Sequence, residues 1–282
     1  MITGLLAALA LWLAGAGGLS AIPGGRDFGR TVPDVRPLEE GEAASVLAEF
    51  RASRGGPDSV LEGDLIHFPR RAEEREWPVT VRTGWAGGVL RLRIDFGGEG
   101  AAGPFLFRGG ADPAGWKVAP GTDGAVRLDG AAMLEPLIPG VELTAFDLTA
   151  PYLDWPDFRY EESVRVSGSP AHWFRFEPPP GWAPLLAEKG IAAVRVALDT
   201  RFNAPIRAEY VGPDGEPARI LEARSFKKFA NTWIVRRLEA FDAATRDRSE
   251  LRIEDALVEI RLPGSVFRPE GLSEPAPAAD RP

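Results

Sequence analysis

The pattern of hydrophobic and polar positions predicts a protein built mostly from β-strands. The alternation is clearest in VLRLRIDF, where Leu90, Leu92, Ile94 and Phe96 would point to one face and Arg93 to the other. Similar short segments, separated by turn residues such as GPDG, recur through both halves of the chain and give about 11 strands. The sequence therefore predicts an antiparallel sheet with one apolar face and one solvated face.

The strands fall into two long series, at residues 60–108 and 163–262. The second series ends with two separate segments at residues 249–253 and 258–262. Before the first series, residues 38–53 place apolar side chains at helical spacing, which predicts an N-terminal helix that packs on the sheet.

A short helical stretch interrupts the strands between Pro139 and Ser163. Thr144 and Asp147 have the spacing of a capping box, so a helix is expected to start at this threonine. The apolar side of this stretch consists of Leu143, Phe146, Leu148 and Tyr152. Because a short helix is unstable alone in water, we expect this side to lie on the apolar face of the sheet as a lid or plug.

The ends of the chain differ from the middle in composition. Residues 1–21 resemble a secretory signal peptide, with a mature N-terminus expected between about Gly17 and Ile22; an uncleaved anchor is the alternative. Residues 22–37 are expected to form a linker and residues 273–282 a disordered tail. A single domain at residues 38–272 remains between them.

Composition and charge narrow the classes of function. The net charge of -8 argues against a nucleic-acid partner, because such binding depends on a basic face. The absence of cysteine excludes disulfides, thiolate metal sites and a cysteine nucleophile. With an export signal, these features favour the periplasm as the compartment.

Motifs for catalysis are scarce. The two histidines, His67 and His172, lie in strand patterns and are interpreted as structural, although a serine and a carboxylate could meet either of them in the fold. GEGAAG at residues 98–103 precedes a strand and not a helix, so it is interpreted as a hairpin loop. Asp154 and Asp157 are too few for a calcium loop. We expect no catalytic residue, no metal site and no cofactor.

Two of the four lysines stand between aromatic residues in Phe226-Lys227-Lys228-Phe229. This pattern suits contact with an anionic headgroup. The preferred interpretation is an exposed strand edge that lysines protect against pairing with other chains.

Several segments of the second half resemble a known family. They are Val194–Asp199, Pro205, Arg207–Tyr210, Gly215, Trp233–Val235, Leu251–Asp255 and Val266–Pro269. They are similar to the outer-membrane lipoprotein-sorting proteins, which are LolA-like periplasmic carriers. The similarity extends over about residues 38–272, with the stretch Leu143–Trp155 at the place of the family's helical insertion. The family's lid-latching arginine cannot be assigned to any one arginine of this sequence.

The resemblance implies a mainly β (α+β) fold, a half-open antiparallel β-barrel whose concave apolar face holds acyl chains under a helical lid. A curved sheet with one large apolar face also tends to enclose a ligand. The expected cavity wall is Trp85, Leu90, Leu92, Ile94, Phe96, Phe105, Phe107, Val194, Val196, Leu198, Tyr210 and Trp233.

The leading hypothesis is a non-enzymatic periplasmic carrier or chaperone for lipoprotein acyl chains or a related lipid. An inner-membrane donor, an outer-membrane acceptor and a monomeric state are expected with it. Two alternatives remain open, a lipid-sensing module that binds a protein partner and a hydrolase.

Overall fold

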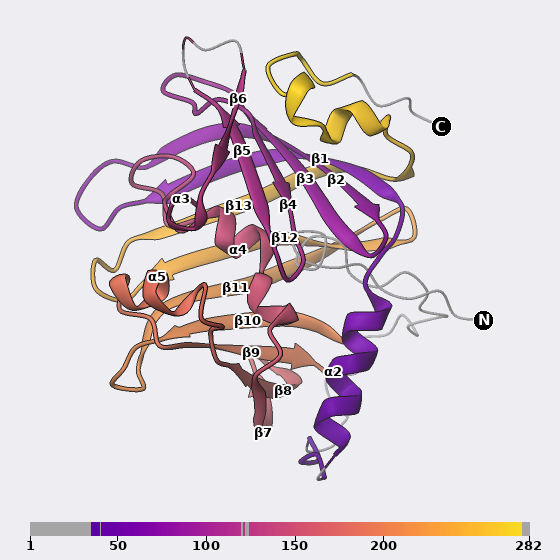
Figure 1. Cartoon of the computed structure of the whole chain (residues 1–282), viewed down its shortest axis with the longest axis vertical. Coiled ribbons are helices and arrows are strands. Elements are labelled where there is room, and N and C mark those ends of the chain that lie inside the picture. The colour runs from indigo at the N-terminus through magenta and orange to yellow at the C-terminus, as the bar shows by residue number, and fades with distance from the viewer. Residues whose placement is uncertain (1–34, 40, 120, 122–123, 278–282) are drawn as a thin grey trace.

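The sheet is a single layer of 13 antiparallel strands that curves around a hollow (Figure 1). The computed structural model describes residues 35–39, 41–119, 121 and 124–277. The strands are β1 (Asp58–Phe68), β2 (Arg75–Ala86), β3 (Val89–Phe96), β4 (Phe105–Arg108), β5 (Ala114–Val118), β6 (Ala125–Leu128), β7 (Phe158–Val166), β8 (Ser169–Phe176), β9 (Ala193–Asp199), β10 (Ala204–Val211), β11 (Pro217–Phe229), β12 (Thr232–Asp242) and β13 (Arg248–Ile260).

The strand order is β6-β5-β4-β3-β2-β1-β13-β12-β11-β10-β9-β8-β7. Each half of the chain is thus a meander of neighbouring strands, and the two halves join where β1 pairs with β13. The edges β6 and β7 do not pair, so the sheet is open along one side. This arrangement confirms the expected mainly β fold with the character of a half-open barrel.

The expected number of about 11 strands was too low because two strands, β5 and β6, were missed. β5 and β6 are short and offer too few alternating positions to be recognised in the sequence. In the opposite direction, the segments expected at residues 249–253 and 258–262 are one strand, β13, which runs without a break through Glu254 and Asp255. Bulges in its pairing with β1 accommodate this irregular middle part.

The helices are few and short. They are α2 (Glu42–Ser53), α3 (Gly130–Met133), α4 (Ala145–Thr149) and α5 (Ala183–Glu188), with 3-10 turns η1 (Pro151–Asp154), η2 (Gly264–Phe267) and η3 (Pro269–Gly271). The N-terminal helix α2 begins four residues later than the expected Leu38, after Gly41 in a left-handed conformation, and it buries Leu47 and Phe50. In Figure 1, α3 and α4 lie in the hollow between the two halves of the sheet.

The apolar face of the sheet forms one large core inside the hollow. Side chains of both halves, of α2 and of the central helical stretch all belong to this single cluster. Among its members are the largest fully buried side chains Trp77, Trp155, Tyr152, Tyr210 and Phe146. The core therefore joins the curved sheet to the segment that fills it.

The outer face of β3 is not solvated, contrary to the expectation for Arg93. This arginine is only 2% exposed, because the C-terminal segment covers it. Its guanidinium donates hydrogen bonds to Asp95 and to the backbone carbonyls of Gly271, Leu272 and Glu274. A second, smaller apolar cluster lies under the same segment and includes Val60, Leu106, Leu262, Val266, Phe267 and Leu272. Glu274, at the start of the tail predicted to be disordered, thus contacts the sheet.

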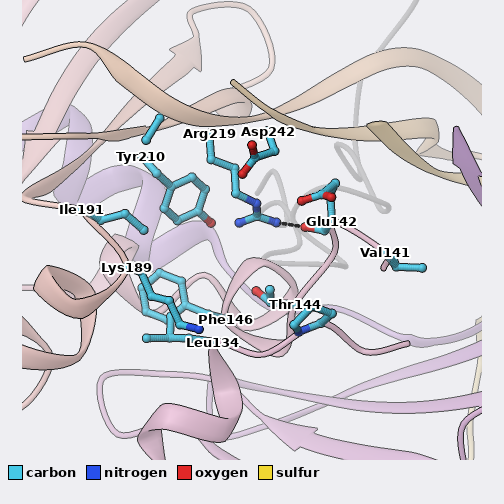
Figure 2. Close-up of a pocket in the computed structure, with 12 residues that line it drawn as sticks. Leu134, Val141, Glu142, Thr144, Phe146, Lys189, Ile191, Tyr210, Arg219 and Asp242 are labelled. Atoms are coloured by element: carbon cyan, nitrogen blue, oxygen red, sulfur yellow. Dashed lines mark hydrogen bonds between the residues drawn. The ribbon is translucent and has the colours of Figure 1, made fainter. Parts of the chain in front are cut away.

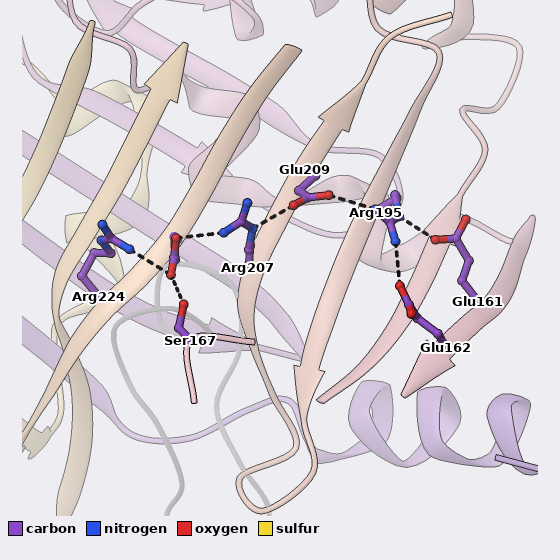
Figure 3. A network of polar contacts seen from close by, with 8 residues as sticks. Glu161, Glu162, Ser167, Arg195, Arg207, Glu209 and Arg224 are labelled. Carbon is purple, nitrogen blue, oxygen red and sulfur yellow. Dashed lines mark hydrogen bonds and ion pairs between the residues drawn. The ribbon is translucent and has the colours of Figure 1, made fainter. Parts of the chain in front are cut away.

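Charged residues form a connected network across β7, β9, β10 and β11 (Figure 3). Arg195 pairs with Glu161 and Glu209, and Arg207 links Glu209 at 2.8 Å to Glu222 at 3.3 Å. Arg195 alternates with Val194 and Val196 of the inner core, so the network lies on the outer face. It satisfies the charges of this face and holds four strands in register.

Candidate functional site

The centre of the site is the segment Pro136–Trp155, here called the plug, which lies in the hollow of the sheet. Its helix α4 starts as the sequence predicts. The Thr144 hydroxyl accepts a hydrogen bond from the backbone N–H of Asp147, and the Asp147 carboxylate accepts one from the N–H of Thr144. After α4 the chain turns at Ala150, in a left-handed conformation, and Pro151 opens η1.

Most of the plug is buried, including all residues of α4. The four expected lid residues are at most 2% exposed: Leu143, Phe146, Leu148 and Tyr152. The ring of Phe146 contacts plug residues Tyr152 and Trp155, and it also contacts Tyr210 of β10 and Trp182, with a distance of 4.9 Å between the ring centres in the last case. The plug therefore occupies the concave face as a filled core and not as a loose cover.

A buried ion pair holds α4 to the sheet. Arg219 of β11 contacts both carboxylate oxygens of Asp147, whose side chain is fully buried, and it also donates to the backbone carbonyl of Glu142. The Tyr210 hydroxyl donates to the same carboxylate. Figure 2 shows the guanidinium reaching between Tyr210 and Glu142.

The protonation states in this group are well defined. Burial lowers the pKa of Arg219, but the contact with Asp147 outweighs it and raises the pKa above its usual value. Burial and the charge of Asp147 raise the pKa of Tyr210 well above 10, which keeps its hydroxyl a hydrogen-bond donor. The plug is thus latched to β10 and β11 by one cation and one neutral donor.

The other end of the plug is attached to α2. Arg51 donates to the backbone carbonyls of Leu153 at 2.8 Å and Trp155 at 2.7 Å. Arg54 forms a bidentate ion pair with the carboxylate of Asp154. Arginines from two distant elements therefore fix both ends of α4–η1.

Beside α4 lies a cavity of about 240 Å³ (Figure 2). Its lining consists of Leu134, Pro136, Val141, Glu142, Thr144, Phe146, Lys189, Ile191, Tyr210, Ala218, Arg219 and Asp242. Of the expected cavity wall only Tyr210 lines it, together with Phe146 of the lid. In this state, most of the expected acyl-binding space is filled by the plug.

The structure brings most of the expected wall residues together. Nine of them are buried members of the inner cluster: Leu90, Leu92, Ile94, Phe105, Phe107, Val194, Val196, Leu198 and Tyr210. Trp85 and Phe96 pack against it while partly buried. Trp233 lies apart from this cluster, directly opposite Lys228 on the β11–β12 hairpin. Arg219 was missed, because nothing in the sequence distinguishes it from the other arginines.

No protein-family model and no curated protein matches the sequence. Solved structures do match. A domain described as an outer membrane lipoprotein-sorting protein from Vibrio parahaemolyticus is 17% identical, with a TM-score of 0.69, and covers 81% of this chain and 97% of that chain. A DUF1329 family protein from Desulfovibrio piger is 14% identical, with a TM-score of 0.68 and coverage of 82% and 98%. A LolA superfamily protein from Nitrosomonas europaea is 13% identical, with a TM-score of 0.58 and coverage of 80% and 97%.

The chain has a LolA-like fold. These matches span nearly the whole length of the three solved structures and about four fifths of this chain. At such low identity the likeness concerns the fold, which the sequence resemblance led us to expect.

Each of the two histidines in the LolA-like fold lies beside a serine hydroxyl. The Nδ1 atom of His67 lies 3.3 Å from the Ser249 hydroxyl, and that of His172 lies 2.6 Å from the Ser163 hydroxyl. Burial is the main cause that lowers the pKa of both imidazoles. No carboxylate among the described residues forms a hydrogen bond with either ring, and no cluster of metal-ligating side chains occurs in that part of the chain.

Glu142 is one of the titratable groups that line the cavity. The pKa of its carboxyl is raised from 4.5 to about 7, first by burial and then by the negative charge of Asp242, while Arg219 acts in the opposite direction. The backbone carbonyl of Glu142 accepts a hydrogen bond from Arg219, and its N–H donates one to the Ser249 hydroxyl. The carboxyl group of Glu142 therefore ionises at the end of the plug that Arg219 holds.

Replacing Glu142 with glutamine should therefore stabilise the protein above neutral pH. An acid whose pKa is raised by folding favours the unfolded state when it ionises, so the wild type loses this stability as the pH rises from about 4.5 to about 7. Near pH ~4.5 the variant should melt at the same temperature as the wild type. At pH ~8 it should melt higher, by ~2–4 °C for each kcal/mol gained in the free energy of unfolding. Thermal unfolding followed by circular dichroism measures this, with the exposed Glu135→Gln as a control that keeps the wild-type pH dependence. Parallel curves for Glu142→Gln and the wild type would contradict it.

Proposed function

We propose that this protein is a non-enzymatic carrier or chaperone that binds the acyl chains of a lipoprotein, or a related lipid, on the concave face of its sheet. The observation that carries the proposal is the plug: a short segment whose buried side is mostly apolar occupies a concave apolar face of a sheet that is open along one side. An acyl chain offers the same kind of surface and could take its place.

The energetics of such an exchange are adequate. Burying eight methylenes would contribute roughly 6 kcal/mol at about 0.8 kcal/mol each, before the cost of ordering the chain. The plug residues Phe146 and Leu148 would lose a comparable apolar environment when they move. The ligand and the plug therefore compete for one surface, and the plug keeps the empty protein soluble.

Arg219 fits the role of a latch for this lid. With Tyr210 it joins the sheet to Asp147 in α4, and it also donates to the carbonyl of Glu142 just before the helix. When the pair opens, both charges regain their hydration, which offsets part of the lost attraction. Such a latch can therefore hold the lid and still open.

A periplasmic carrier of this kind would receive its ligand from a donor at the inner membrane and pass it to an acceptor at the outer membrane. Export depends on residues 1–21, which lie outside the described part of the chain, as does most of the linker at 22–37. Across the described residues, no helix combines the length and apolarity needed to cross a membrane.

A fluorescent acyl probe tests the proposal, together with native mass spectrometry for co-purifying lipid. Leu92→Gln, on the inner face of β3, should weaken probe binding about tenfold or more, because a buried polar group without a partner would line the acyl site. The control is Leu106→Gln on β4: Leu106 is equally buried, but it belongs to the outer cluster. Arg93→Gln is unsuitable, since Arg93 holds the C-terminal segment.

Both variants should be titrated well below their melting temperatures. Both should lose stability, but only Leu92→Gln should lose affinity. Equal loss of probe binding in the two variants would refute the assignment of the inner face as the binding surface.

A further inference from the structure

The far end of the β11–β12 hairpin, residues 225–236, differs from the rest of the sheet. Its strands pair only with each other, in the order Phe226 with Val235, Lys228 with Trp233 and Phe229 with Thr232. In the described pairings, β10 contacts β11 only up to Glu222, and β13 contacts β12 only from Arg237 onward. This two-stranded end, here called the ribbon, thus forms no ladder with β10 or β13, although the Thr232 hydroxyl donates to Glu259 of β13 at 3.3 Å.

The ribbon carries exposed aromatic and cationic side chains. Phe226 is 40% exposed and is one of two large hydrophobic residues that are exposed in the described part of the chain. Lys228 lies opposite the half-buried Trp233, and Phe226, two residues from Lys228, shares their face of the ribbon. Lys227 lies beside the ring of Phe229 and donates to the backbone carbonyl of Glu254.

The charge of the ribbon is opposite to that of the protein. SFKKFANTWIVR contains three cations and no acid, in a chain with a net charge of -8. One of the three, Arg236, pairs with Glu254 at 3.2 Å, whereas no ion pair involves Lys227 or Lys228 within the described residues. Half of the chain's four lysines are therefore adjacent on the ribbon.

β11 lies inside the strand order of the sheet, whose edges are β6 and β7. Along the ribbon, however, β11 has no ladder partner on the side away from β12, so the interpretation of lysines that protect an exposed strand edge stays a prediction. Edge protection does not account for the aromatic side chains beside these lysines. The ribbon combines an exposed phenylalanine, a half-buried tryptophan and lysines without an acidic partner. Residues of these types are typical of membrane interfaces, where aromatic rings lie at the depth of the headgroups and lysines contact anionic headgroups.

We propose that the ribbon docks the protein on a bilayer surface that contains anionic phospholipids. Phe226 and Trp233 would enter the headgroup region, and Lys228, on the same face, would bind lipid phosphates. The contact area is small, so the binding is weak, reversible and sensitive to salt, as a carrier that visits a membrane and leaves it requires. The inference extends the proposed carrier function by naming a partner, and its test does not depend on acyl binding.

Co-sedimentation with vesicles tests it, with vesicles of phosphatidylglycerol and phosphatidylethanolamine in equal parts against vesicles of phosphatidylcholine. The wild type should bind the anionic vesicles, and high salt should release it. Lys228→Glu should weaken this binding about fivefold or more, and Phe226→Ser should weaken it as well.

The chain supplies matched controls elsewhere on its surface. Lys117→Glu changes the charge equally at an exposed position of β5, and Val126→Ser removes the other exposed apolar side chain. Both controls should bind vesicles like the wild type. The proposal is overturned if the wild type does not co-sediment with anionic vesicles, or if the ribbon variants and the control variants lose binding equally. Acyl-probe titration without vesicles separates this failure from failure of the carrier function, because the ribbon variants should bind the probe normally.

Discussion

Replacing Arg219 with methionine should release the plug and tighten the binding of an acyl probe while it lowers the melting temperature. The substitution leaves the Asp147 carboxylate, which is fully buried, without its cation. Breaking a buried pair in this way costs the closed state roughly 3–5 kcal/mol. If the plug can leave the sheet, Asp147 reaches water and the open state is favoured instead. A closed state preferred by about 2 kcal/mol leaves only a few per cent of molecules competent, so affinity could rise up to ~30-fold.

The double variant Arg219→Met/Asp147→Asn is the control for this prediction. It removes both charges. The amide oxygen of the asparagine can accept the hydrogen bond of the Thr144 N–H in place of one carboxylate oxygen, and its NH2 group, in place of the other, can donate to the Tyr210 hydroxyl. Its probe affinity and melting temperature should return toward those of the wild type. Weaker or unchanged probe binding by Arg219→Met, with the double variant no better, would show that Arg219 is not a latch.

Phe146→Ser should also tighten probe binding, although the folded protein becomes less stable. The ring of Phe146 is fully buried between the plug and the sheet, and its removal costs the closed state roughly 1.5–3 kcal/mol of apolar burial. The ligand-bound state does not contain this contact, so it loses less. Release of the ligand to an acceptor should slow, because the plug competes less well for the surface.

A phenylalanine outside the hollow gives the comparison. Phe267→Ser removes a buried ring from the outer cluster under the C-terminal segment. Loss of a residue that is in place in both states destabilises both alike, so this variant should lose stability and keep its wild-type affinity. Titrations of both proteins with the same probe, well below their melting temperatures, decide the matter: unchanged or weaker binding by Phe146→Ser would exclude a movable lid.

The parts of the site that could be predicted from sequence are those determined by near neighbours in the chain. The start of α4 was correct because Thr144 and Asp147 form a capping box over three residues. The alternation in β3 likewise placed Leu92 and Ile94 in the inner core. Such signals need no knowledge of the rest of the fold.

The parts that could not be predicted depend on contacts between distant segments. Arg219 is one of many arginines in strands, and only the folded sheet brings it to Asp147, 72 positions away. Arg93 alternates like a solvated residue, but a segment from the other end of the chain covers it. The same applies to Trp233, whose apolar strand pattern does not show that it lies opposite Lys228 outside the inner cluster.

Because β1 pairs with β13, the first strand of the chain has no partner on one side until the last strand has been synthesised. The hairpins of each half can form early from contacts that are local in sequence, whereas joining the halves closes a loop that spans nearly the whole domain. Pairing at such long range slows folding, and an unpaired strand edge can associate with other chains in the meantime. The pairing of β13 with β1 therefore completes the sheet and covers the strand edge of β1 that could otherwise associate with other chains.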